Sequence, residues 1–283
     1  MKFWKMHGAG NDFVVFDGFA ESSDDWGKTA LLLCDRHFGV GADGIEFCTK
    51  SEVADIRYNY YNADGSRGEM CGNGIRCFSK YVYEKGIVTK ERFTAETDAG
   101  IKEIVLSLDA EKKVRAVSVG MGKGNFDPAA IPCKLGKEET LNEELVIEGK
   151  KIVFSSVLMG VPHTVIFTDD PDDWDLEGIG PLIERHEAFP RKTNVNFVQI
   201  IDDATIRVKT WERGAGHTLA CGTGSCAVAI LARKLGKIKG DKVRLILEGG
   251  EVEVALGKDY EVTLTGPAAK VFEGEIDLGG GKV

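Results

Sequence analysis

The sequence predicts a mixed α/β fold built as two related lobes, and three observations support this expectation. A Cys-Gly-x-Gly tetrapeptide occurs twice, at Cys71 and at Cys221, with an offset of 150 residues. Each copy is followed by an apolar segment with helical spacing and is surrounded by short segments that alternate like strands. The length of 283 residues accommodates two domains of about 140 residues each.

Other segments repeat in the same order along the chain, at offsets of 149 to 151 residues. The matched pairs are Val14–Phe16 with Val165–Phe167, Asp35–His37 with Glu184–His186, Asp43–Phe47 with Asn194–Val198, and Tyr61–Asn62 with Trp211–Glu212. A coincidence among glycine-rich turns is the alternative. Five matches in one order favour two copies of one fold, whose lobes can face each other across a cleft.

The expected elements are distributed over both lobes, which we place at residues 1–118 and 119–265. Strands are expected at 12–16, 101–108, 114–119, 151–154, 205–209, 243–247, 252–255 and 262–265. One buried helix is expected from Ile75 to a stop at Gly86, and a second around Ala227 with a stop at Gly236. Residues 120–132, with three Gly and two Pro, are the expected linker.

Composition excludes several classes of function. The net charge is −9, from 36 basic and 45 acidic residues, which argues against a nucleic acid or an anionic membrane as partner. The longest apolar run, Cys226–Ala232, is far shorter than the roughly 20 residues that cross a bilayer. The N-terminus has no apolar core of a signal peptide. We therefore expect a cytoplasmic protein with a small-molecule substrate.

Seven cysteines, an odd number, indicate a reducing compartment rather than a disulfide framework. No Cys-x-x-Cys pair is present, so we expect no metal site. Five cysteines are expected to be small buried apolar groups: Cys34, Cys48, Cys77, Cys133 and Cys226.

Cys71 and Cys221 differ from these because each precedes an expected helix. A helix N-terminus favours a thiolate and can lower the pKa of a cysteine. Its N–H groups also bind a carboxylate, and the glycines allow a close approach. A structural cysteine in a tight turn is the alternative for one copy alone. Two opposed thiols could flank the α-carbon of a bound amino acid, so that one removes the α-proton and the other delivers a proton from behind. No lysine has a context typical of a pyridoxal Schiff base, so we expect no cofactor.

Polar residues accompany these turns. Glu212 and Arg213 precede the second cysteine and could hold an ammonium and a carboxylate, or they could be a solvated surface pair. His7 and His163 lie near glycine-rich turns, where a structural role is the more common one.

The motifs resemble the diaminopimelate epimerases, which are cofactor-independent. The resemblance runs from Met6 to about Gly274 and rests on these segments: Lys5–Phe13, Gly39–Gly44, Asn62–Ser66, Cys71–Cys77, Glu212–Gly216 and Ala220–Gly224. It implies two pseudo-symmetric lobes, each a curved, mostly antiparallel sheet around a central helix, with residues 266–283 returning to the first lobe. A homodimer is also implied.

The resemblance also implies residue roles. Cys71 and Cys221 would be the catalytic bases that interconvert LL- and meso-2,6-diaminopimelate, a step toward lysine and peptidoglycan precursors. The backbone at Gly72, Asn73, Gly222 and Thr223 would hold the reacting carboxylate. Five side chains would bind the substrate, several of them at its distal end: Asn11, Asn62, Asn194, Glu212 and Arg213.

One departure from the family stands at Val161-Pro162-His163, where Asn-Pro-His is usual. Valine cannot hydrogen-bond to a distal group, which leaves room for a racemase of another amino acid such as histidine or proline. His217 also replaces a frequent acid. A phenazine-type isomerase or a non-catalytic relative of the fold is a third alternative, against which the paired cysteines weigh.

Overall fold

The computed structural model describes residues 1–136 and 138–278. The chain divides into two compact units: one comprises Met1–Gly120 with the C-terminal segment from Gly266, and the other comprises Met121–Thr265.

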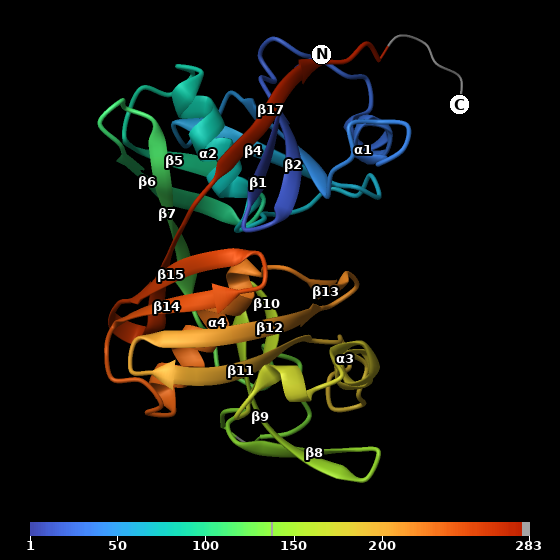
Figure 1. Cartoon of the computed structure of the whole chain (residues 1–283), viewed down its shortest axis with the longest axis vertical. Helices are drawn as coiled ribbons and strands as arrows, with labels where there is room; N and C mark the ends of the chain where they lie inside the picture. Colours follow the sequence, from blue (N-terminus) through green and yellow to red (C-terminus); the bar gives the residue numbers. More distant parts are fainter. Residues whose placement is uncertain (137, 279–283) are drawn as a thin grey trace. The chain divides into compact units, whose positions relative to one another are not determined.

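The first unit is a curved sheet with neighbouring strands in the order β17–β1–β2–β3–β4–β5–β6–β7. Its strands are β1 (Lys2–Gly8), β2 (Asn11–Phe16), β3 (Gly44–Thr49), β4 (Ile56–Asn62), β5 (Arg92–Thr97), β6 (Gly100–Leu108), β7 (Val114–Lys123) and β17 (Ala269–Glu275). Pairing is parallel between β2 and β3 and between β4 and β5, and antiparallel elsewhere. The last strand of the chain therefore lies beside the first (Figure 1).

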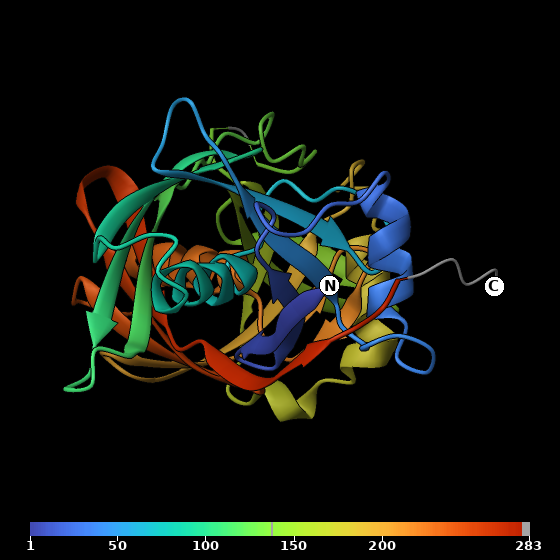
Figure 2. The ribbon, with the colours of Figure 1, turned by 90° about the horizontal axis from the view of Figure 1, so that it is seen from above.

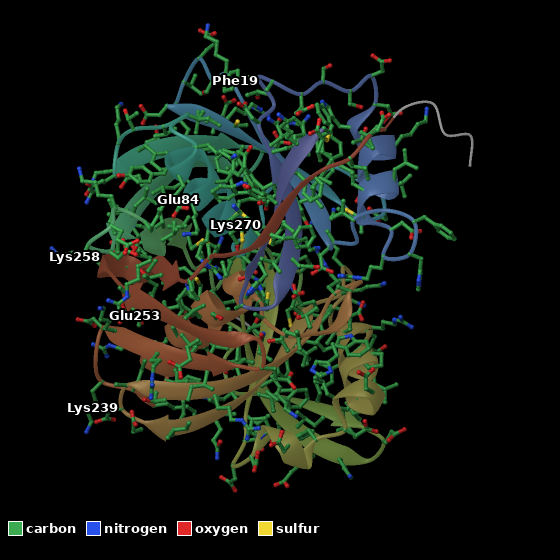
Figure 3. All side chains as sticks on the ribbon, turned by 45° about the horizontal axis from the view of Figure 1, so that its top comes forward. Phe19, Glu84, Lys239, Glu253, Lys258 and Lys270 are labelled. Atoms are coloured by element: carbon green, nitrogen blue, oxygen red, sulfur yellow. The ribbon has the colours of Figure 1, made fainter. Side chains whose placement is uncertain are left out.

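Helix α2 (Gly74–Glu84) forms the centre of this unit, and the strands curve around it (Figure 2). Ile75, Cys77, Phe78 and Val82 are fully buried on it, which confirms the expected central helix. Glu84, labelled in Figure 3, accepts from the N–H of Val114 at 2.9 Å and so fastens the end of α2 to β7.

Helix α1 (Trp26–Cys34) packs on β3 and β4. Asp25 caps it by accepting the Lys28 N–H at 3.1 Å. This helix was not predicted from the sequence.

The second unit repeats the arrangement. Its strands are β8 (Glu143–Ile147), β9 (Lys150–Met159), β10 (Val161–Phe167), β11 (Asn194–Asp202), β12 (Thr205–Glu212), β13 (Gly216–Thr218), β14 (Lys242–Leu247), β15 (Gly250–Leu256) and β16 (Glu261–Gly266). They pair in the order β8–β9–β10–β11–β12–β14–β15–β16, with β13 also beside β12. Pairing is parallel between β10 and β11 and between β12 and β14.

Helix α4 (Gly222–Lys234) is the central helix of this unit and contacts β9, β10, β11 and β15. Its residues from Cys226 to Ala232 are all buried, so it is apolar on every side. The shorter α3 (Leu176–Glu184) packs against β11 and β12. Two 3-10 turns complete the unit, η1 (Pro171–Asp173) and η2 (Lys258–Tyr260).

The strand registers confirm the internal repeat and correct one detail of it. Ile45 pairs with Tyr61 in the first unit, and Val195 pairs with Trp211 in the second, so these residues correspond at an offset of 150. The offset of 151 expected for Val14–Phe16 and for Asp43–Phe47 is wrong by one residue, because Phe13 pairs with Gly44 where His163 pairs with Asn194. Such a slip would turn every side chain of the strand to the opposite face of the sheet.

The expected linker also needs correction, because β7 continues to Lys123 and includes the first part of 120–132. The alternating pattern of Val114–Val119 does not end at the glycines, which alternate with Met121 inside the strand. The burial of the five cysteines outside the tetrapeptides is confirmed. Within the described part of the chain, no helix is long and apolar enough to cross a membrane.

Candidate active site

The two cysteine turns have the same local geometry. Cys71 accepts the N–H of Gly74 on its sulfur at 3.5 Å, and its carbonyl accepts the N–H of Ile75 at 2.9 Å. Cys221 accepts the N–H of Gly224 on its sulfur at 3.4 Å, and its carbonyl accepts the N–H of Ser225 at 2.9 Å. Each sulfur therefore lies at the N-terminus of its central helix, as the sequence predicted.

The second glycine of each tetrapeptide is required by close packing on a strand beneath it. A Cβ on Gly74 would lie 1.7 Å from Glu46 Oε1 on β3, and a Cβ on Gly224 would lie 2.7 Å from Asn196 Oδ1 on β11. Glu46 and Asn196 thus occupy corresponding places in the two units, and one carries a carboxyl group where the other carries an amide.

In the first unit, the structure brings Asn11 and Asn73 to Cys71. The thiol of Cys71 donates to Asn11 Oδ1 at 3.5 Å, and Asn73 Nδ2 donates to the same oxygen at 3.4 Å. Asn62 bonds within its own turn instead, to Ser66 Oγ at 3.0 Å and to the hydroxyl of Tyr60 at 2.6 Å. These contacts fix the turn that follows β4, where Gly65 lies close to Gly27 and Leu31 of α1.

Arg76 is fully buried on α2, and its hydrogen bonds fix the Cys71–Asn73 turn. Its guanidinium donates to the carbonyl of Gly72 at 2.8 Å, to Asn73 Oδ1 at 3.0 Å and to the carbonyl of Pro267 at 3.2 Å. These bonds hold the Asn73 side chain in place at the start of α2.

Glu46 is a buried carboxyl group that the sequence analysis did not identify as a functional residue. The Tyr58 hydroxyl donates to Glu46 Oε1 at 2.7 Å, while Oε2 has no hydrogen-bond partner among the described residues. Burial raises the pKa of Glu46 to about 8. The available signal was a single acidic residue inside the apolar strand segment Gly44–Cys48.

In the second unit, Cys221 contacts Glu212 at the end of β12. The thiol donates to Glu212 Oε2 at 3.2 Å, and Thr218 Oγ1 donates to Glu212 Oε1 at 2.6 Å. Burial, and then the charge of Glu212, raise the pKa of the Cys221 thiol well above its usual range. The hydrogen bonds from Thr223 and from the N–H of Gly224 at the helix start do lower the pKa of Cys221, but burial and Glu212 raise it by more.

Asn194 and Arg213 join the ends of three strands. Asn194, buried, donates to the carbonyl of Pro162 at 2.8 Å and accepts the N–H of Arg213 at 2.8 Å. The Arg213 guanidinium donates to the carbonyl of Arg191 at 3.1 Å. Half-buried Val161 begins β10 directly before this junction.

The three histidines of the sequence analysis have separate surroundings. His163 is fully buried, and burial followed by the charge of Arg213 lowers its pKa to about 3, so the imidazole is neutral. His7 accepts the N–H of Gly10 at 3.3 Å and thereby closes a turn, which is a structural role. His217 lies beside Glu248 and Glu177.

The site residues contain acids, amides and thiols, and the structure offers no metal cage from them. Among residues 1–136 and 138–278, no group of three or more His, Cys, Asp or Glu side chains is arranged to hold a metal ion.

Comparison with known proteins gives one consistent result. Residues 3–126 and 155–271 match the family model described as diaminopimelate epimerase. The diaminopimelate epimerase of Alkaliphilus metalliredigens is 46% identical over 97% of this chain and 96% of its own length. That of Caldanaerobacter subterraneus is 45% identical over 98% of this chain and 100% of its own. A phenazine biosynthesis protein of the PhzF family from Bacillus anthracis has a similar fold, with a TM-score of 0.72, 18% identity and 98% coverage of both chains.

Proposed function

This chain belongs to the diaminopimelate epimerase family, and we propose that it interconverts LL- and meso-2,6-diaminopimelate by inverting one α-carbon. The observation that carries the proposal is the matched pair of cysteine turns, each with its sulfur at the start of a buried helix. The reaction would serve the biosynthesis of lysine and of peptidoglycan precursors.

Inversion requires two proton-transferring groups on opposite faces of the α-carbon, and Cys71 and Cys221 take these roles in the proposal. One cysteine, as thiolate, accepts the α-proton when the C–H bond breaks. The other, as thiol, gives its proton to the opposite face when the new C–H bond forms. Each turnover leaves the two sulfurs with their protonation states exchanged, so no external acid, base or electron carrier is consumed.

The substrate carboxylate is proposed to lie at the helix starts. The first N–H groups of a helix have no carbonyl partner within it, and their field favours an anion. Gly72 and Asn73 provide such groups near α2, and Gly222 and Thr223 provide them at α4. The same donors stabilise the enediolate, whose negative charge grows on the carboxylate as the α-proton leaves.

The contact between Cys221 and Glu212 supports an assignment of the resting protonation state. Glu212 accepts the thiol hydrogen, and a second negative charge at the sulfur would be repelled by the carboxylate. We therefore assign Cys221 as the thiol of the ligand-free enzyme. It would donate first, and Cys71, whose thiol hydrogen meets a neutral amide rather than a carboxylate, would give up its proton and act as the base.

The substrate is also proposed to bind to Asn11, Asn62, Asn194, Glu212 and Arg213, several of them at its distal amino-acid end. The guanidinium can offer a carboxylate two parallel N–H donors, which an ammonium cannot reproduce. Val161 corresponds to Asn11 at the offset of 150, and it lies directly before the Pro162 carbonyl to which Asn194 donates. Because Asn194 and Arg213 remain bonded to each other beside it, the valine leaves the polar junction intact.

A homodimer is part of the proposal. Strand β17, on which Lys270 is labelled in Figure 3, exposes Val271 by 59% and Phe272 by 46%. Exposed apolar side chains on one strand are suited to an interface with a second copy. We also propose a cytoplasmic location, where a reducing environment keeps the catalytic thiols reduced.

The test is incubation with LL-diaminopimelate in deuterated water, followed by proton NMR of the α-position and chiral separation of the products. Deuterium incorporation together with formation of the meso isomer supports the proposal. Activity on L-histidine or L-proline but not on diaminopimelate would establish the alternative racemase. No exchange with any of the three substrates would indicate a non-catalytic relative.

A further inference from the structure

A carboxylate outside the cysteine turn contacts one of its amides. Asp43, directly before β3, accepts from Asn11 Nδ2 at 2.6 Å and from the N–H of Asp12 at 3.1 Å. Its other oxygen accepts from the guanidinium of Arg36 at 2.9 Å, and Arg36 also donates to both carboxylate oxygens of Asp12. Asp43 is therefore held in place, although its side chain is 43% exposed.

This contact determines which end of the Asn11 amide faces the cysteine. A carboxylate only accepts hydrogen bonds, so the NH₂ group of Asn11 must turn toward Asp43. Its carbonyl oxygen then faces the Cys71 thiol at 3.5 Å and Asn73 Nδ2 at 3.4 Å, and both are donors. The reversed amide would place its NH₂ group against these two donors and its oxygen against a carboxylate.

We propose that Asp43 is a positioning residue for proton transfer at Cys71, because it orients the Asn11 amide to accept the thiol hydrogen. The inference rests on the proposed function, in which Cys71 is an acid and base. Asp43 acts on Cys71 through Asn11.

The two units provide different hydrogen-bond acceptors for the cysteine thiol. In the second unit the cysteine thiol donates directly to the carboxylate of Glu212. In the first unit the neutral amide of Asn11 accepts the thiol hydrogen of Cys71. The carboxylate of Asp43 contacts the other end of that amide. A thiol hydrogen bond to an acceptor favours the protonated form of the sulfur, and a hydrogen bond from an NH₂ group favours the thiolate.

The test measures the ionisation of Cys71 without using catalysis. The full-length protein is alkylated with iodoacetamide between pH 6 and pH 10, and the modified peptides are quantified by mass spectrometry. In Asp43→Asn, the new amide no longer requires the NH₂ group of Asn11. We expect the midpoint of Cys71 alkylation to fall by half a pH unit or more, while Cys221 in the same sample is unchanged.

A double-mutant cycle separates amide orientation from the mere loss of a charge. In an Asn11→Ala background, Asp43→Asn should leave the Cys71 midpoint unchanged, since the orienting link is already absent. A midpoint that falls equally in both backgrounds, or in neither, would overturn the proposal. Asp25→Asn is the matched control, since it removes a first-unit carboxylate that caps α1 and should shift neither cysteine.

Two further measurements keep the outcome unambiguous. If circular dichroism shows that Asp43→Asn does not fold, Asp43→Ser replaces it with the same expectations, because a hydroxyl can accept from the NH₂ group of Asn11 or donate to its carbonyl oxygen. Epimerisation by Cys71→Ala is assayed separately. If that variant remains active, the proposed catalytic function fails, whereas the alkylation cycle still decides whether Asp43 orients Asn11.

Discussion

Replacing Glu46 by Gln removes a buried carboxyl group while its size is preserved. In the folded protein, burial raises the pKa of Glu46 to about 8, against 4.5 for the exposed group in the unfolded chain. Tyr58 from β4 donates to it, and Arg76 on α2 is the charged residue that lowers its pKa. Between these two pH values, the unfolded chain has released this proton and the folded protein has not.

The free energy of unfolding of the native protein therefore falls as the pH rises through this window. At about 1.4 kcal/mol per pH unit, the interval from pH 4.5 to pH 6 corresponds to about 2 kcal/mol. The full interval, complete above pH 8, corresponds to about 5 kcal/mol. The Glu46→Gln variant has no carboxyl group to ionise at this position and does not lose this free energy. Its free energy of unfolding minus that of the native protein should therefore increase by about 3 kcal/mol between pH 6 and pH 9.

The measurement is urea-induced unfolding of both proteins at pH 6 and pH 9, followed by circular dichroism. A difference in unfolding free energy that is the same at the two pH values would refute the reasoning, because Glu46 would then ionise normally in the folded state. The converse variant is Asn196→Asp, at the corresponding buried place beneath Gly224. It should lose stability with rising pH, since it introduces a carboxyl group that burial keeps protonated.

Three further predictions concern the candidate site. Cys71→Ala and Cys221→Ala should each reduce epimerisation by about a thousandfold, measured as α-deuterium exchange, and more than a tenth of the native rate in either variant would contradict the two-base mechanism. Arg213→Lys should lower kcat/KM for diaminopimelate by at least about tenfold, or roughly 1.4 kcal/mol, although the charge is kept, and an unchanged value would remove Arg213 from the distal site. Burial and Arg213 lower the pKa of His163 to about 3, so below pH 6.5 the unfolded chain binds a proton that the folded state does not; native stability should fall by about 2 kcal/mol from pH 6.5 to pH 5. His163→Gln should abolish that fall in urea unfolding, and a loss of the same size in the variant would exclude His163 as its source.

The backbone of the site followed from short-range patterns in the sequence. A cysteine between an extended segment and an apolar helical pattern, with glycines around it, predicts a sulfur at a helix start, and both copies lie there. The internal repeat predicted the two units, because the same sequence of strand pairings is encoded twice. Helix α1 was not predicted, since its apolar residues from Ala30 to Cys34 are consecutive rather than spaced at a helical interval, and its capping residue Asp25 lies among other polar residues.

The polar contacts beneath the helices could not be predicted in the same way, because their partners are distant in the sequence. Arg76 reaches the carbonyl of Pro267, 191 residues away. The Cys221 thiol is governed by its burial and by Glu212, neither of which is visible in the Cys-Gly-x-Gly pattern. Local sequence thus places the candidate sulfur at a helix start, whereas tertiary packing sets its burial and its hydrogen-bond partners.

The comparison of the two units shows how a repeated backbone yields two different thiols. Each cysteine turn has one carboxyl group and one amide nearby, but in exchanged positions. At Cys71 the amide of Asn11 receives the thiol hydrogen and the carboxyl of Glu46 lies under the helix start. At Cys221 the carboxylate of Glu212 receives the thiol hydrogen and the amide of Asn196 lies under the helix start. Under the proposed mechanism, proton transfer across a carbon needs one acid and one base at a time, and this exchange gives the two thiols different hydrogen-bond acceptors on equivalent scaffolds.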